Sequence, residues 1–264
     1  MSHLPFALRA GLVSMAVLLA ACGSSPPDTI SLPAQGAAVS ADVRTQPVRR
    51  ELTKPGCKGE DCPRIVVDSI AFPEIPALTQ HVDSSLAGMT GVDANLRGAY
   101  RTIDEYIAYF WRTAQPRDRT ELRAKVRDVV ADVIGVELQT AQYLTGAAHG
   151  IPATHFLNWQ RASGRELVLD DVLIPGRRDQ YVQALRTAHR AWLKQNEDAA
   201  RDPAAYDRTW PFVESSNYTL TRQGMVVKYD AYSIAPYSHG QPELTIPYDA
   251  LRGILKPEFM PAGG

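Results

Sequence analysis

The sequence contains little cysteine and no excess of positive charge. Only three of its 264 residues are cysteine, and 28 lysines and arginines stand against 29 aspartates and glutamates. No cluster of lysine and arginine is longer than two residues. Nucleic-acid binding requires a basic surface that neutralises phosphates, so this composition argues against a nucleic-acid partner.

Motifs of catalysis and cofactor binding are also missing. The chain has no Gly-x-Ser-x-Gly nucleophile elbow, no Walker A phosphate loop and no His-Glu-x-x-His zinc motif. His149 and His155 are six positions apart, and they would need further ligands to hold a metal ion. We therefore predict no cofactor and no metal site, and we name no catalytic residue. His149 is instead expected to hydrogen-bond within a tight loop of glycine and alanine.

An uncharged, largely apolar run lies at the N-terminus. Arg9 precedes the uncharged residues Ala10 to Ala21. A positive charge, then an apolar run, then small residues is the order of a secretory signal peptide. A helix of that length spans roughly 18 Å, less than the ~30 Å hydrocarbon core of a membrane. We predict that residues 1–21 are a signal peptide and not a transmembrane helix.

The end of this run indicates the type of signal. Leu19-Ala20-Ala21-Cys22 resembles a lipobox, in which bacteria attach diacylglycerol to the cysteine thiol and cleave the chain just before it. We predict a lipoprotein whose mature chain begins at Cys22 and is held to a membrane by its acyl chains. The alternative is an ordinary signal peptide followed by an unrelated cysteine. Gly23 stands where an aspartate would favour the inner membrane, so for a Gram-negative source we predict the outer membrane, with the domain facing the periplasm.

The predicted mature chain divides into a tether and a domain. Residues 22–50 are rich in serine, proline, alanine and glycine and show no apolar periodicity. We predict a flexible tether there, with a root-mean-square reach of about 30 Å. Residues 51–264 are predicted to form one folded domain, because their length suits a single domain with its own core.

Two cysteines remain in the predicted domain, Cys57 and Cys62. They lie in the segment Gly56-Cys-Lys-Gly-Glu-Asp-Cys62-Pro63. Exported proteins fold in an oxidising compartment, so we expect a local structural disulfide. A redox or metal-binding pair is the alternative. However, the spacing differs from that of thioredoxin-like motifs, and no second cysteine pair is present to complete a zinc site.

Helical and extended patterns are interspersed along the domain. They predict strands at 64–72 and 154–161, two strands within 125–144 joined by a turn near Ala131, a hairpin of 217–221 with 225–229, and a short strand at 244–246. Helices are predicted at 76–88, from a capping motif at Thr102-Ile-Asp-Glu105 onward, at 179–194 and at 247–255. This order contains no regular βαβ repeat. We therefore predict the α+β class, a single mixed domain with an antiparallel-rich sheet flanked by helices.

Four segments carry a resemblance to a known family. They are Cys57 to Pro73; Tyr143-Leu-Thr-Gly-Ala-Ala-His149-Gly150; Asn158 with Ser163-Gly-Arg-Glu-Leu-Val-Leu-Asp-Asp171; and Tyr232-Ser-Ile-Ala-Pro-Tyr237-Ser-His-Gly240 followed by Ile246-Pro-Tyr248. Together they resemble the RsiV-like family of exported bacterial domains over residues 50–257. Ala147 stands where that family has a second glycine.

The resemblance implies an α+β domain in which strands from both halves share one sheet beside helices. Some RsiV-like relatives are membrane-bound anti-sigma factors that bind lysozyme, and others stand beside peptidoglycan deacetylase domains. The leading hypothesis is a lipid-anchored periplasmic domain that binds a protein, such as lysozyme or a toxin, or a cell-wall glycan, without catalysis. The alternatives are an enzyme acting on peptidoglycan or a small ligand, and a structural envelope lipoprotein.

The candidate ligand-binding residues are Tyr143, His149, Tyr237 and His239, which lie in two of the resembling segments. Tyrosine offers a broad apolar ring and a hydroxyl, which suits contact with a glycan or a protein. Loops held by rigid strands often carry binding sites. We expect these four side chains to converge on one polar and aromatic patch. Tyr229 and Tyr232 are expected to pack in the sheet or the core.

Overall fold

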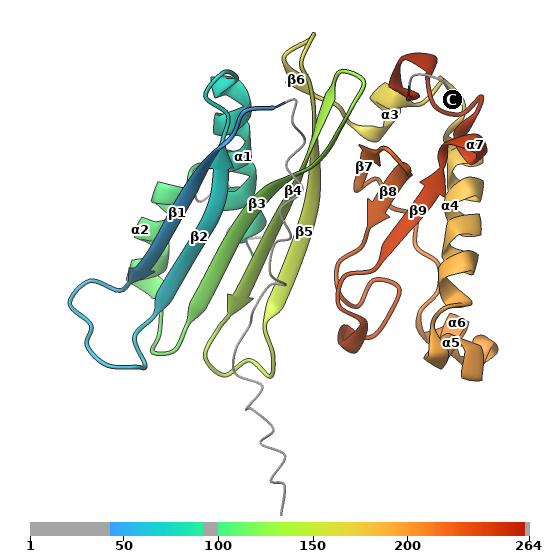
Figure 1. Cartoon of the computed structure of the whole chain (residues 1–264). Coiled ribbons are helices and arrows are strands. Elements are labelled where there is room, and N and C mark those ends of the chain that lie inside the picture. Colours follow the sequence, from blue (N-terminus) through green and yellow to red (C-terminus); the bar gives the residue numbers. More distant parts are fainter. Residues whose placement is uncertain (1–42, 92–99, 262–264) are drawn as a thin grey trace, which may run out of the picture.

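The computed structural model describes residues 43–91 and 100–261 of the chain. The predicted signal peptide, Cys22 and the predicted tether up to residue 42 lie outside the described residues. Within those residues, no helix is long and apolar enough to cross a membrane. The described part is an α+β arrangement of two β-sheets and their helices (Figure 1).

The larger sheet has six strands, whose spatial order follows their order in the sequence. They are β1 (Gln46–Thr53), β2 (Arg64–Ala71), β3 (Arg119–Val130), β4 (Val133–Tyr143), β5 (Ile151–Gln160) and β6 (Arg165–Glu166). All neighbours are antiparallel except β2 and β3, which are parallel. A parallel pair needs a long crossover connection, and α1 (Pro76–Met89) and α2 (Ile103–Thr113) lie in it.

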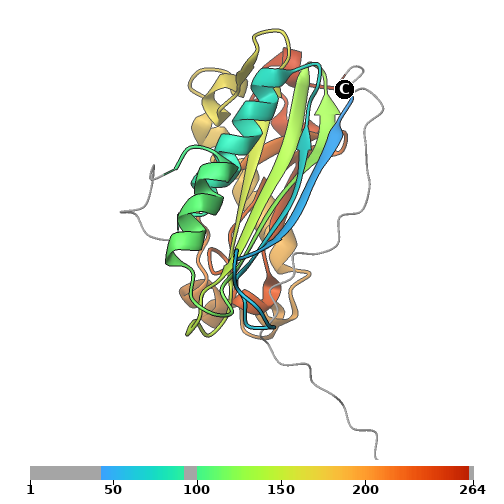
Figure 2. The same cartoon turned by 90° about the vertical axis from the view of Figure 1, so that its left-hand side faces the viewer.

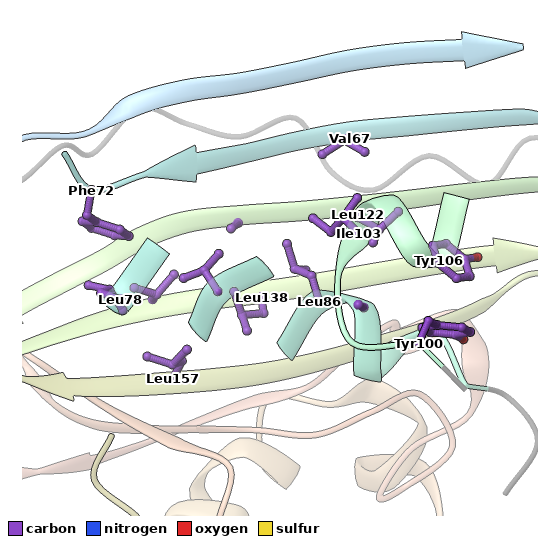
Figure 3. Close-up of a cluster of buried hydrophobic side chains, with 14 of the residues drawn as sticks. Val67, Phe72, Leu78, Leu86, Tyr100, Ile103, Tyr106, Leu122, Leu138 and Leu157 are labelled. Carbon is purple, nitrogen blue, oxygen red and sulfur yellow. The ribbon is translucent and has the colours of Figure 1, made fainter. Parts of the chain in front are cut away.

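Both crossover helices cover the same face of this sheet (Figure 2). The start of α2 confirms the predicted capping motif, because Thr102 Oγ1 accepts a hydrogen bond from the Glu105 backbone N–H at 3.2 Å. Apolar side chains from the helices and the sheet form the first hydrophobic core (Figure 3). Its fully buried members include Ile65, Leu78, Leu86, Leu122, Leu138 and Leu157. Full burial of each such side chain stabilises the fold by about 1.5–3 kcal/mol, which holds both helices on the sheet.

The C-terminal half forms a separate three-stranded antiparallel sheet. Its strands are β7 (Tyr218–Thr221), β8 (Gly224–Lys228) and β9 (Glu243–Pro247). The helices before it are α3 (Leu169–Val172), α4 (Arg178–Leu193), α5 (Glu197–Arg201) and α6 (Pro203–Thr209), and α7 (Tyr248–Leu251) follows it. A second hydrophobic core joins this sheet to α4 and α7. The expectation that strands of both halves share one sheet is therefore wrong.

Asn217 and Asp230 close the outer edge of the larger sheet. β6 pairs with β5 only at Trp159 and Gln160. Further along β5, Asn217 Oδ1 accepts from the Phe156 N–H at 2.7 Å, and Asp230 Oδ1 accepts from the Thr154 N–H at 2.8 Å. These side chains satisfy backbone groups that a further strand would otherwise pair with. The sheet consequently ends at β5 and β6, and the second sheet packs against it without extending it.

The central strand β4 is buried along its whole length, because it is covered on both faces. Successive side chains of a strand point to opposite faces. Val136 and Leu138 belong to the core under α1 and α2. Glu137 points to the other face, where it meets Lys228 of β8 with 2.5 Å between Oε1 and Nζ. A buried ion pair thus lies between the two sheets.

Several predicted boundaries differ from the structure; for example, β3 begins at Arg119 and not at 125. β1 begins at Gln46, inside the range 22–50 that the sequence predicts as a tether. β1 is an edge strand paired with β2, and edge strands tolerate a proline such as Pro47. The predicted helix at 247–255 is also too long. α7 ends at Leu251, and Gly253 has a φ of +71°, a left-handed conformation that does not continue a helix.

The predicted disulfide is confirmed. Cys57 and Cys62 are bonded in the loop between β1 and β2, with their Cα atoms 5.8 Å apart. Replacing both by serine is expected to lower the free energy of unfolding by about 2 kcal/mol, because the unfolded chain regains loop entropy. Urea unfolding of the variant and of wild type measures this loss. Wild type treated with reductant should match the variant, whereas equal midpoints for the variant and oxidised wild type would contradict the prediction.

Candidate functional site

Several loops gather at one end of the molecule, the lower end in Figure 1. They include residues 144–150 between β4 and β5, and residues 229–242 between β8 and β9. Both loops belong to segments that carried the family resemblance. Each connects strands of a packed sheet, so the sheets hold the two loops in place relative to one another.

His149 and Tyr237 meet between these two loops. Their rings stack with centroids 4.3 Å apart and planes inclined by 28°. The ring centroid of Tyr232 lies 5.7 Å from that of His149 and 5.6 Å from that of Tyr237. Trp210, which follows α6, stacks on Tyr232 with 6.1 Å between centroids. We call His149, Trp210, Tyr232 and Tyr237 the loop aromatic surface.

The hydrogen bonds of His149 define its tautomer. Nδ1 lies 2.9 Å from the Gly150 carbonyl oxygen, which can only accept, so Nδ1 carries the proton. In a neutral imidazole Nε2 is then an acceptor, and the Tyr232 hydroxyl donates to it at 3.0 Å. Burial raises the pKa of Tyr237, so its hydroxyl is protonated at neutral pH. The surface therefore presents aromatic rings together with phenol hydroxyls and an imidazole.

Tyr232 is the residue of this surface that sequence reasoning misplaced. The expectation that it packs in the core is wrong, because 49% of its surface is exposed. Its φ of +69° lies in the left-handed region, which is uncommon for a bulky residue. Such backbone strain tends to occur at functional sites. Tyr229, by contrast, is buried as expected, and its hydroxyl donates to the Val213 carbonyl oxygen at 2.8 Å.

The other two candidate residues have different partners. Tyr143 ends β4, is buried and lies opposite Arg119 of β3. His239 shares the short turn η2 (Tyr237–His239) with Tyr237. Its ring nevertheless lies against Trp192 of α4, with 6.3 Å between centroids. The structure thus brings His149 and Tyr237 together and places Tyr143 and His239 in other surroundings.

His149 and His155, the two histidines considered as a metal pair, contact different groups in the structure. His155 Nε2 lies 3.5 Å from Glu166 Oε1, whereas His149 contacts a carbonyl oxygen and a hydroxyl. In residues 43–91 and 100–261, no group of three or more His, Cys, Asp or Glu side chains is placed to hold a metal ion. The groups of the loop aromatic surface are ring faces, phenol hydroxyls and an imidazole, which suit noncovalent contact.

Trp210 is the functional candidate that sequence reasoning did not name. It lies outside the four resembling segments, and its neighbours Pro211 and Thr209 give no pattern that points to a site. Only the packing of α5 and α6 beside the 229–242 loop brings it to Tyr232. The Tyr206 hydroxyl of α6 donates a hydrogen bond to the Ile234 carbonyl oxygen of that loop at 3.4 Å, which is part of that packing.

Comparisons with known proteins agree with this fold. A family model described as "Protein of unknown function (DUF3298)" matches residues 170–249. The crystal structure of a DUF3298 family protein from Pseudomonas aeruginosa PAO1 is similar at a TM-score of 0.76 and 37% identity, over 83% of this chain and 97% of that one. A DUF3298 family member from Bacteroides fragilis NCTC 9343 shares the fold at a TM-score of 0.63 and 19% identity, over 82% and 95% of the two chains.

No protein with curated annotation matches the chain significantly. The family assignment therefore rests on the matched segment and on the Pseudomonas structure. Residues 170–249 run from α3 into α7, and they include Trp210, Tyr232 and Tyr237. The chain belongs to the DUF3298 family.

Proposed function

We propose that this protein is a lipid-anchored envelope lipoprotein whose domain binds a macromolecule through the loop aromatic surface, without catalysis. The anchor in this proposal is Cys22 of the lipobox-like segment, and the domain works in the periplasm beside the outer membrane. The RsiV-like resemblance supports a partner near the cell wall. That partner is a protein, such as lysozyme or a secreted toxin, or a wall glycan.

The stacked pair of His149 and Tyr237 is the observation behind this proposal. It joins two loops that are far apart in the sequence but lie in segments of the same family resemblance. The rings already support one another, so they lose little conformational freedom when a partner binds. Tyr232 is half exposed beside them, and exposed tyrosine and tryptophan side chains supply much of the energy of many interfaces.

The variant Tyr237→Ala is expected to weaken partner binding by at least about tenfold, because it removes an aromatic anchor and the ring that supports His149. Isothermal titration calorimetry measures this with the mature chain carrying Cys22→Ser, which remains unlipidated. Lysozyme and soluble muropeptides are titrated separately. Tyr109→Ala is the control, because Tyr109 is a partly exposed tyrosine on α2, outside the loop aromatic surface.

Three results would count against the proposal. If neither lysozyme nor muropeptides bind, the immobilised chain is incubated with envelope extract. Failure to retain any protein or glycan from the extract would contradict binding. Equal affinities of wild type and Tyr237→Ala would place the interface elsewhere. Cleavage of muropeptides during the titration would favour the alternative of an enzyme.

A further inference from the structure

The segment from Ser163 to Asp171, together with Asn158, has no role in the proposed function. In the structure it borders a cavity of about 210 Å³ between β5, α3 and β7. The residues used in the following argument are Phe156, Asn158, Glu166, Asp170, Arg178 and Tyr218, all of which line the cavity. They come from β5, β6, α3, α4 and β7, and the loop aromatic surface contributes no residue to the lining.

Asn158 lines the cavity and carries an unpartnered acceptor. The residue is 1% exposed, and its Nδ2 donates to the Tyr218 carbonyl oxygen at 2.7 Å. This bond fixes the orientation of the side-chain amide, because a carbonyl oxygen can only accept. Asn158 Oδ1 is buried and has no hydrogen-bond partner in the part of the chain that the structure describes. A ligand N–H or O–H would relieve the cost of that unsatisfied acceptor.

Glu166 adds an anionic group to the same cavity. Its Oε2 lies 2.7 Å from His81 Nε2, and its Oε1 lies 3.5 Å from His155 Nε2. Burial alone raises the pKa of Glu166, but hydrogen bonds and charge interactions with His155 and His81 outweigh it and leave the pKa below its usual range. The carboxylate is therefore ionised at neutral pH.

Two carboxylates, Glu166 and Asp170, and one cation, Arg178, line the cavity, which leaves a negative excess. Asp170 Oδ1 lies 2.9 Å from Arg178 Nη1, and Glu214 Oε1 lies 2.9 Å from Arg178 Nη2. One guanidinium is thus shared by two carboxylates, and Glu166 is a third carboxylate. The side chains of Phe156 and Tyr218 are buried and give the cavity apolar wall. The cavity combines acceptors, negative charge and apolar surface.

We propose that this cavity binds a small organic ammonium group, which donates a hydrogen bond to Asn158 Oδ1 and is neutralised by Glu166 and Asp170. The carbon part of the ligand packs on Phe156 and Tyr218. The proposal does not depend on the loop aromatic surface, since a different set of side chains carries it. An anion would meet the carboxylates unfavourably, and a neutral alcohol would satisfy Asn158 alone.

The probe for this site is n-butylammonium, titrated at pH 8 into the ¹⁵N-labelled mature chain carrying Cys22→Ser. Nuclear magnetic resonance follows the side-chain amide of Asn158. A saturable shift is expected with n-butylammonium. We expect n-butanol to bind at least about tenfold more weakly, because hydrogen bonds to charged groups are the stronger ones. Butyrate should cause no saturable shift.

Two variants and two controls locate the site. Glu166→Gln and Asp170→Asn are each expected to weaken n-butylammonium binding about tenfold. Glu60→Gln removes the same charge from the exposed loop between β1 and β2, and it should leave the affinity unchanged, as should Tyr237→Ala. Thermal unfolding of each variant checks that it is folded. The absence of a saturable shift in wild type, an equal response to butyrate, or unchanged affinity in both cavity variants would overturn the proposal.

Discussion

Replacing Glu137 by glutamine is expected to lower the free energy of unfolding by about 3–5 kcal/mol, the range measured when one partner of a buried ion pair is removed. The Glu137 side chain is 1% exposed and that of Lys228 is 7% exposed. Lys125 and Arg127 also approach Glu137 Oε2 at 3.2 Å, and Glu243 lies 3.1 Å from Lys228. Three cations therefore surround two carboxylates. Glutamine would leave those three cations facing one carboxylate between the sheets.

Urea unfolding measures the loss, and two further variants identify its cause. Asp249→Asn is the matched control, because it removes the same charge from an exposed pair with Arg252 and should cost less than about 1 kcal/mol. The double variant Glu137→Leu with Lys228→Met replaces both charges by apolar side chains and should recover part of the loss. A loss for Glu137→Gln as small as that of Asp249→Asn would show that the buried pair contributes little.

The same carboxylate makes stability depend on acid pH. Burial raises the pKa of Glu137, but Lys228, then Lys125 and Arg127, outweigh it and lower the pKa below its usual range. A lowered folded-state pKa means that the ionised Glu137 carboxylate stabilises the fold completely at a pH above its unfolded-state pKa of about 4.3. This stabilisation is lost as the pH falls through the lower folded-state pKa. Wild type should thus lose stability on acidification more steeply than Glu137→Gln does.

Gly135→Ala is expected to lower the free energy of unfolding by about 2–3 kcal/mol, the upper part of the range for overpacked cores. Gly135 lies on β4 and faces the second sheet. A Cβ atom there would overlap Thr219 Oγ1 of β7 and lie 3.4 Å from the Asp128 carbonyl oxygen. Thr219 is fully buried, so its side chain has little room to move away. The two sheets would be pushed apart at this contact.

A second substitution tests this explanation of the Gly135→Ala loss. Thr219→Ala removes the Oγ1 atom, and the remaining Thr219 Cβ lies 3.6 Å from the new methyl position, an ordinary van der Waals distance. Thr219 Oγ1 has no hydrogen-bond partner among the described residues, so its removal alone should cost little. Urea unfolding of the single and double variants measures the coupling. A double variant as unstable as Gly135→Ala would contradict overlap with Thr219 as the cause.

The candidate site was only partly predictable from the sequence. His149 and Tyr237 could be named because they lie in recognisable loop segments. Tyr143 could not be excluded, because its burial at the end of β4 depends on what covers that strand. Tyr232 turns outward through a left-handed backbone conformation, and the strand-like pattern around it gives no sign of that. Contacts between two loops depend on how the sheets that hold them are packed.

Local interactions account for what the sequence by itself determined: the β-branched strand β2, the capped start of α2, and the bond between Cys57 and Cys62. Each of these depends on residues only a few positions apart. The tertiary structure decided the separate second sheet, the ion pair between Glu137 and Lys228, and the meeting of His149 with Tyr237. Those partners are about 90 residues apart, and Asn217 and Asp230 close the edge of β5 from a distant part of the chain. Such contacts depend on the packing of both cores, because burial and long-range geometry, and not local pattern, bring the partners together.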